Sequence, residues 1–243
     1  MTNKIVAALI GMLLMGLGTG AHAAGCPAAP PAQIAFEPQP SPLPQDTSAS
    51  AKDLAIKLGA DADHRAPGYY EANTAMTSKR DTAIAKLPDG TVCAVAAKLT
   101  VKLSLDRKLW LASELNDDKC VQQAFATAYG QRAKADDDTI AQFGQTVVPT
   151  YQAQLTAIGW QTSKSQEDAV KAVADKIAPI MTDIQTKYVA ARAAAQAKID
   201  LSHLPPEECG GATAKIGRQV GVAVAADAAP STRGQGLKPA GVQ

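Results

Sequence analysis

The stretch CAVAAKLTVKLSL, residues 93–105, carries the strongest structural signal in this chain of 243 residues. Every odd-numbered position in it is apolar, and polar side chains fill the even positions from Lys98 to Ser104. A period of two is typical of a β-strand with one buried face. Polar residues interrupt the pattern at 106–108, and an apolar run resumes at residues 109–112. We therefore predict a β-hairpin that turns about Arg107.

Upstream of this stretch, the sequence predicts two more strands and a short helix. The strands are expected at residues 69–76 and 82–87, and the second is followed by the turn Pro88-Asp89-Gly90. Ser50 and Asp53 have the spacing of a capping box, which predicts that a helix begins there.

Downstream of Cys120 the apolar period changes to three and four, which is typical of amphipathic helices. One helix is expected to run to Gly159 with a kink at Pro149, and a second from Ser165 to about residue 199. A short connection makes the two an antiparallel helical hairpin over about residues 120–200. The predicted fold class is α+β, with a small antiparallel sheet packed on this long helical hairpin.

The first 23 residues have the features of a secretory signal peptide. Lys4 supplies the positive charge, residues 5–17 the apolar core, and Ala21-His22-Ala23 the small-residue cleavage pattern. We therefore expect a periplasmic or secreted protein of a bacterial cell envelope. Two alternatives stay open: an uncleaved membrane anchor, or cleavage just before Cys26 and acylation of that cysteine.

The mature chain is expected to have three parts. Residues 24–48 are a proline-rich lead-in with one short strand at 34–37, and residues 49–209 form the α+β domain. Residues 210–243 offer no periodic apolar face, so we predict a disordered tail that adds little to stability. Without its signal peptide the chain has 23 basic and 23 acidic residues, a balance that argues against a nucleic-acid binder.

Four cysteines in an oxidising compartment predict two disulfides. A hairpin that turns about Arg107 places residue 93 opposite roughly residue 121, which predicts a Cys93–Cys120 bond. Cys26 and Cys209 then form the second pair and join the two ends of the domain. Acylation of Cys26 is the alternative to its disulfide.

Between residues 91 and 143, the chain has a strand bearing Cys93, a hairpin, the run LWLASEL at 109–115, Cys120 and a long helix. This order resembles a bacterial family, the predicted secreted zinc-dependent proteases. In that family the helix carries H-E-x-x-H, in which two histidines bind zinc and the glutamate is the general base. The three functional positions fall on Ala128, Tyr129 and Arg132. The resemblance therefore implies a protease-like shell whose catalytic motif is lost.

Other residues that could carry chemistry have plainer interpretations. The mature chain keeps only His64 and His203, too few and too distant for a zinc site, so we expect no metal and no cofactor. Asp136-Asp137-Asp138 would point in different directions on a helix, which favours a solvated face. Arg132 and Asp136 interrupt the apolar stripe one turn apart, either as an ion pair or as the polar remnant of a metal site.

The two tryptophans outside the signal peptide are not expected to bind a ligand. Trp110 lies in an apolar run, which predicts a place in the core, whereas Trp160 follows Gly159 at the turn between the helices.

Together these observations favour a non-enzymatic protein. We expect an exported cell-envelope scaffold or interaction module, a degenerate member of the protease-like family, with an envelope protein as its partner. The alternatives are an envelope hydrolase whose active site is not recognised, and an acylated accessory lipoprotein. Nucleic acid is not an expected partner, and a membrane is one only if Cys26 is acylated.

Overall fold

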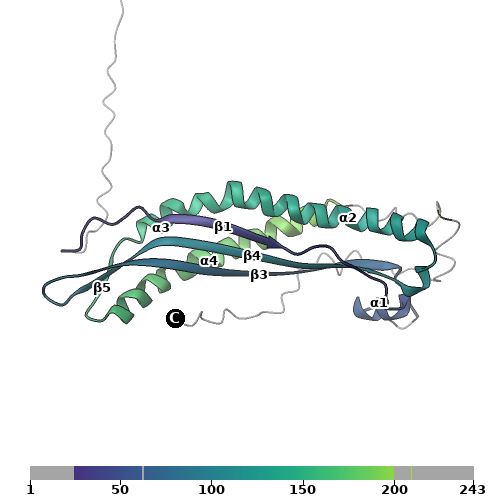
Figure 1. Cartoon of the computed structure of the whole chain (residues 1–243), viewed down its shortest axis with the longest axis horizontal. Helices are drawn as coiled ribbons and strands as arrows, with labels where there is room; N and C mark the ends of the chain where they lie inside the picture. Colours follow the sequence, from purple (N-terminus) through teal and green to yellow (C-terminus); the bar gives the residue numbers. More distant parts are fainter. Residues whose placement is uncertain (1–24, 62, 200–208, 210–243) are drawn as a thin grey trace, which may run out of the picture.

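The computed structural model describes residues 25–61, 63–199 and 209 of the chain. The predicted signal peptide, the predicted tail and His203 lie outside these residues. The described part is elongated, because two long strands and two long helices run along the same direction (Figure 1). In chain order the helices and strands are β1 (Gln33–Pro40), β2 (Gln45–Asp46), α1 (Ala51–Lys57), β3 (Gly68–Lys86), β4 (Val92–Leu111), α2 (Lys119–Gln142), α3 (Gln152–Ala157), β5 (Gln161–Ser163) and α4 (Gln166–Gln196).

The sheet is mixed, so the predicted antiparallel sheet is wrong. β4 is its central strand: β3 and β5 pair with β4 in antiparallel fashion, whereas β1 and β2 pair with it in parallel. Both parallel strands come from the lead-in, and α1 and β3 lie between them and β4 in the chain. A period of two identifies a strand but says nothing about its direction, which is why the sequence did not reveal this arrangement.

The predicted turn about Arg107 is also wrong, because β4 continues unbroken from Val92 to Leu111. Its partner β3 lies opposite the polar residues 106–108 and supplies backbone partners for them. The hairpin of this sheet instead turns at Pro88-Asp89-Gly90, where a turn was predicted. Gly90 has a φ of 81°, and the Asp89 carboxylate accepts a hydrogen bond from the Thr91 amide.

A β-bulge changes which face of β4 is buried against the helices. Lys98 pairs with Asp81 and Ala96 with Thr82, so Ala97 has no partner on β3. The core cluster shared with the helices therefore contains Val92, Ala94 and Ala96 before the bulge and Leu99, Val101, Leu103 and Leu105 after it. The predicted single face of odd-numbered residues holds only from Leu99 onward.

The structure pairs Cys26 with Cys93 and Cys120 with Cys209, so the predicted pairing is wrong. The error follows from the straight course of β4. Cys93 lies near the start of β4, and 18 residues at roughly 3.3 Å each separate it from the end of the strand, about 60 Å. Cys120 lies beyond that end, in the first turn of α2, and cannot reach Cys93.

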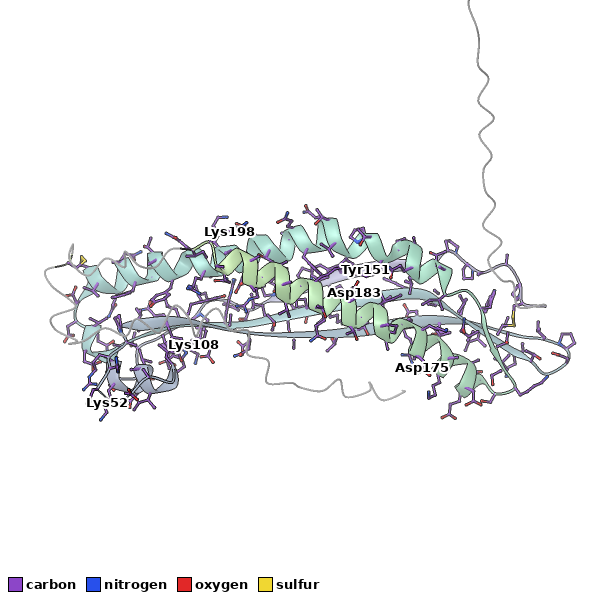
Figure 2. All side chains as sticks on the ribbon, turned by 180° about the vertical axis from the view of Figure 1, so that it is seen from behind. Lys52, Lys108, Tyr151, Asp175, Asp183 and Lys198 are labelled. Carbon is purple, nitrogen blue, oxygen red and sulfur yellow. A yellow bond between two sulfur atoms is a disulfide. The ribbon has the colours of Figure 1, made fainter. Side chains whose placement is uncertain are left out.

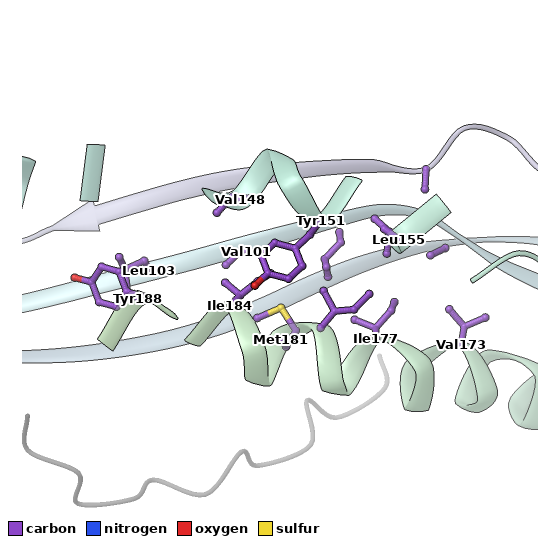
Figure 3. Close-up of a cluster of buried hydrophobic side chains, with 14 of the residues drawn as sticks. Val101, Leu103, Val148, Tyr151, Leu155, Val173, Ile177, Met181, Ile184 and Tyr188 are labelled. Atoms are coloured by element: carbon purple, nitrogen blue, oxygen red, sulfur yellow. The ribbon is translucent and has the colours of Figure 1, made fainter. Parts of the chain in front are cut away.

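The two helical segments lie on the same side of the sheet and share its core. Helical backbone continues past Pro149, as predicted, but changes type: a π-helix at Phe143–Val147 and a 3₁₀ turn at Val148–Tyr151 join α2 to α3. Pro179 lies inside α4, as predicted. Figure 3 shows side chains of α4, the 3₁₀ turn, α3 and β4 in one apolar cluster, among them Tyr151, Leu155, Ile177, Ile184 and Leu103.

Polar contacts add to this packing between the helical segments. Tyr151 and Asp183 lie side by side, and the Tyr151 hydroxyl donates a hydrogen bond of 2.5 Å to the Asp183 carboxylate (Figure 2). At the end of the molecule where α1 lies (Figure 1), Ser50 and Asp53 form the predicted capping box of that helix. Glu114 accepts hydrogen bonds from the Ala51 amide in the first turn of that helix.

Candidate functional site

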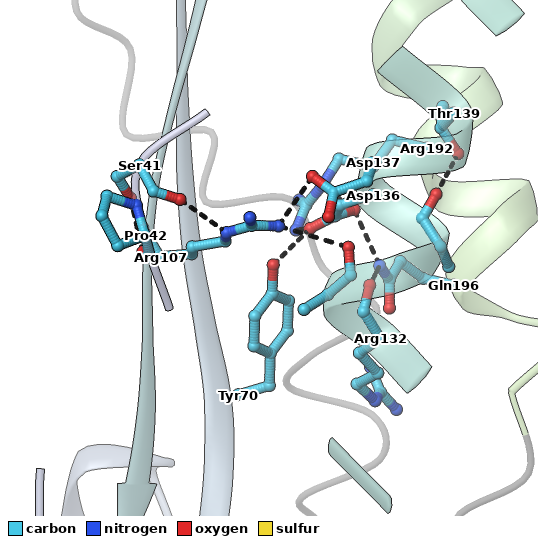
Figure 4. A network of polar contacts seen from close by, with 12 residues as sticks. Ser41, Pro42, Tyr70, Arg107, Arg132, Asp136, Asp137, Thr139, Arg192 and Gln196 are labelled. Atoms are coloured by element: carbon cyan, nitrogen blue, oxygen red, sulfur yellow. Dashed lines mark hydrogen bonds and ion pairs between the residues drawn. The ribbon is translucent and has the colours of Figure 1, made fainter. Parts of the chain in front are cut away.

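The most concentrated group of buried polar side chains that the structure describes surrounds Asp136 on α2. The carboxylate is fully buried and accepts four hydrogen bonds (Figure 4). Its Oδ1 accepts from Arg192 Nε at 2.8 Å and from Gln196 Nε2 at 2.7 Å. Its Oδ2 accepts from Arg192 Nη2 at 3.0 Å and from the Tyr70 hydroxyl at 2.7 Å. A buried carboxylate needs such compensation, since transfer from water into the interior is costly.

These contacts connect three elements of the fold. Asp136 lies on α2, Tyr70 on β3, and Arg192 and Gln196 on α4. Gln196 also donates a hydrogen bond to the backbone carbonyl of Arg132, one turn before Asp136. The group therefore fixes the two long helices against each other and against the start of β3. We call Asp136, Tyr70, Arg192 and Gln196 the polar centre.

The pKa values of Tyr70 and Arg192 are both raised, so both side chains keep the protons that they donate to the Asp136 carboxylate. Burial raises the pKa of the Tyr70 hydroxyl well above its usual value, and the adjacent Asp136 charge raises that pKa further. Burial alone would lower the pKa of Arg192, but its hydrogen bonds and charge pairing with Asp136 outweigh this, and the pKa is raised. Tyr70 therefore stays a neutral donor and Arg192 a cation near neutral pH.

A second ion pair lies at the border of the polar centre. The Arg107 side chain of β4 donates from Nε to the Ser41 carbonyl at 2.9 Å and from Nη1 to Asp137 at 2.8 Å (Figure 4). Arg107, where the sequence predicted a turn, thus connects the lead-in, the central strand and α2. These hydrogen bonds give a charged residue near the end of β4 a structural role.

The three consecutive aspartates have three different partners, as expected for adjacent residues on a helix. Asp136 pairs with Arg192, Asp137 with Arg107, and Asp138 with Lys134. The predicted solvated face is wrong for Asp136, which is fully buried. The predicted ion pair of Asp136 with Arg132 is replaced by the pair with Arg192, because α4 packs across this face of α2.

The three positions where the resemblance would place the zinc motif, residues 128, 129 and 132, are packed into the fold. Tyr129 is buried and donates its hydroxyl to the Gly68 carbonyl at 2.7 Å, and its ring stacks against Phe125. Arg132 is 2% exposed, and Ala128 packs against the apolar cluster around α1 and the first half of α2. In the described ranges there is no group of three or more histidine, cysteine, aspartate or glutamate side chains arranged to hold a metal ion.

Trp110 differs from its predicted place in the core, whereas Trp160 lies where the sequence predicted it. Trp110 is only partly buried: it stacks on Tyr69, donates to Glu71 at 2.6 Å, and has the Lys57 ammonium 3.5 Å from its ring centre. Trp160 lies at the turn after α3, as predicted, and donates to the Pro27 carbonyl at 2.6 Å. It thereby holds the lead-in against the helical segment.

Sequence reasoning did not identify Tyr70, Arg192 or Gln196. A signal was present on α4, where Tyr188, Arg192 and Gln196 follow the apolar stripe at intervals of four residues. Such spacing places all three on one helix face. Only the packed structure shows that this face meets Asp136.

Among the residues that the structure describes, no helix is both long and apolar enough to cross a membrane. The two disulfides are typical of proteins outside the cytoplasm. Comparisons of the chain with protein families, with curated proteins and with solved structures found no match.

Proposed function

We propose that this chain is an exported, non-catalytic scaffold or interaction module of the bacterial cell envelope. In this proposal its shell derives from a secreted zinc-dependent protease that has lost H-E-x-x-H at residues 128–132. The observation that carries the proposal is the closed polar centre. A catalytic carboxylate must reach a substrate or a water molecule, whereas both oxygens of Asp136 are occupied by side chains of the same protein.

The disulfides support the export part of the proposal. They also argue against the acylated lipoprotein, because the sulfur of Cys26 is bonded to Cys93 and a thioether to lipid would need the same atom. Contact with a membrane through Cys26 is therefore not part of the proposal.

The face of the sheet opposite the helices supports the interaction part of the proposal. The core cluster shared with α2 and α4 holds one face of β4, and the side chains between these residues point to the opposite face. Along β4 the opposite face carries Lys98, Lys102, Ser104 and Lys108, which are half-buried, the exposed Asp106 and the buried Thr100. Lys102 pairs there with Glu37 of β1, and Lys108 with Asp46 of β2. A long face of mixed charge suits a protein partner better than an anionic polymer.

The proposal is tested by a photo-crosslinking amino acid placed at Asp106, which is exposed on this face of the sheet. In intact cells we expect a crosslink to a defined envelope protein. The matched control is the same amino acid at Lys134, which is exposed on α2, where no crosslink is expected. Equal crosslinking at both positions, or at neither, would contradict an interaction surface on the sheet.

A further inference from the structure

The outer edge of β3 is a long strand edge that no described strand covers. β3 has 19 residues and pairs only with β4, along its other edge. It forms the lower border of the sheet in Figure 1. Residues 77–81 are all exposed, and Ile84, 41% exposed, is one of two large exposed apolar side chains among the described residues.

Proteins usually block such an edge with proline, a bulge or a very short strand. β3 has none of these: it contains no proline, and the extra residue of the nearby bulge belongs to β4. Its central charges, Lys79, Arg80 and Asp81, are the one feature that restricts pairing. The order of these three charges favours one alignment of a partner strand along the edge of β3 over the neighbouring alignments.

We infer that the partner of this edge is a second copy of the chain, paired through antiparallel β3 strands about a two-fold axis at Arg80. The register follows from charge. With Arg80 opposite its own copy, each Lys79 lies opposite Asp81 of the other chain, twice per dimer. Moving the two-fold axis by one residue, to residue 79 or residue 81, places Lys79 opposite Lys79 or Asp81 opposite Asp81, which is unfavourable.

The same register matches the apolar side chains. Met76 pairs with Leu103 and Ile84 with Ala94 across the hairpin, so both lie on the side of the sheet that faces the helices. About the axis at Arg80, Met76 of one copy lies opposite Ile84 of the other. Pairing of the two strands therefore covers the exposed Ile84. The main contribution that opposes dimerisation is the repulsion between the two Arg80 side chains at the axis.

This inference rests on the proposed function in treating the sheet as the interaction surface, and it names one partner. Sedimentation of the full mature chain at increasing concentration tests it. We expect a dimer that K79D or D81K alone weakens on the order of tenfold, because each change makes two cross-strand pairs repulsive. The exchange K79D with D81K restores both pairs and should restore the dimer.

A register-specific crosslink provides the second readout. The four native cysteines are all disulfide-bonded, so an introduced cysteine would be the one free thiol. R80C should form an intermolecular disulfide at the two-fold axis, because directly opposed Cα atoms lie about 4.5–5.5 Å apart. The control S78C should not, since its copies would lie roughly 13 Å apart along the strands.

Three outcomes would overturn the inference. The chain could remain a monomer at all concentrations, or dimerise without response to K79D, D81K and R80C, which would place the interface elsewhere. Dimerisation only after removal of residues 210–243 would make the tail the occupant of the edge. None of these results depends on whether the crosslinker at Asp106 captures an envelope protein, so failure of the dimer and failure of the proposed function are distinguishable.

Discussion

Replacing Asp136 with alanine should lower the free energy of unfolding by about 3–5 kcal/mol. The change removes the acceptor of four hydrogen bonds and leaves the Arg192 guanidinium, 13% exposed, without its countercharge. Buried donors that lose their acceptor keep the cost of their desolvation. Chemical denaturation followed by circular dichroism measures the effect.

The matched control is Asp138→Ala two residues along the same helix. Asp138 pairs with Lys134, and both side chains are about two-thirds exposed or more, so we expect a loss of at most about 0.5 kcal/mol. Replacing Asp136 and Arg192 together with leucine and methionine should recover much of the lost stability, since no buried charge is then left alone. A loss below about 1 kcal/mol for Asp136→Ala would contradict the structural role of the polar centre.

Replacing Cys26 and Cys93 together with serine should cost about 2–4 kcal/mol of folding stability. The bond joins residues 67 apart in sequence, so its removal gives the unfolded chain considerably more freedom. The double change also frees the start of the lead-in from its covalent link to β4. In the wild type this segment additionally accepts hydrogen bonds at Pro27 from Trp160 and at Ala32 from Gln152. Thermal and denaturant unfolding under non-reducing conditions measure the loss.

The comparison is the double change of Cys120 and Cys209, whose separation of 89 residues is similar. Loop entropy alone predicts that this double change costs the same as that of Cys26 and Cys93 to within a few tenths of a kcal/mol. Peptide mapping of the unreduced wild type should recover Cys26 bonded to Cys93. Recovery of Cys26 with a lipid, or bonded to another cysteine, would contradict the described connectivity.

Local signals in the sequence were the reliable ones. Ser50 with Asp53 marked the start of α1, and the Pro88-Asp89-Gly90 turn marked the hairpin, because each depends only on residues close in the chain. The apolar period of the second helix likewise placed Val173, Ile177, Met181, Ile184 and Tyr188 on one face, and these side chains are buried. Long-range relations failed: residues 106–108 resembled a turn because nothing in the sequence shows that β3 lies opposite them.

The disulfide pairing and the polar centre failed for the same reason. Once the turn was placed at Arg107, Cys93 appeared close to Cys120, so one wrong local assignment produced a wrong tertiary contact. Asp136 was interpreted with neighbours on its own helix, whereas its partners come from β3 and α4. Partners that lie 56 to 66 residues away cannot be read from spacing within one element.

The central claim is that residues 128–132, where the proposed family resemblance places H-E-x-x-H, serve packing and not metal binding. The metal content of the mature protein tests this claim most directly. The protein is purified without chelators and its zinc measured per chain, together with cleavage of a general protease substrate. We predict no stoichiometric zinc and no proteolysis, since Ala128, Tyr129 and Arg132 supply neither ligand nor base. One tightly held zinc per chain, or proteolysis that a zinc chelator abolishes, would contradict the account.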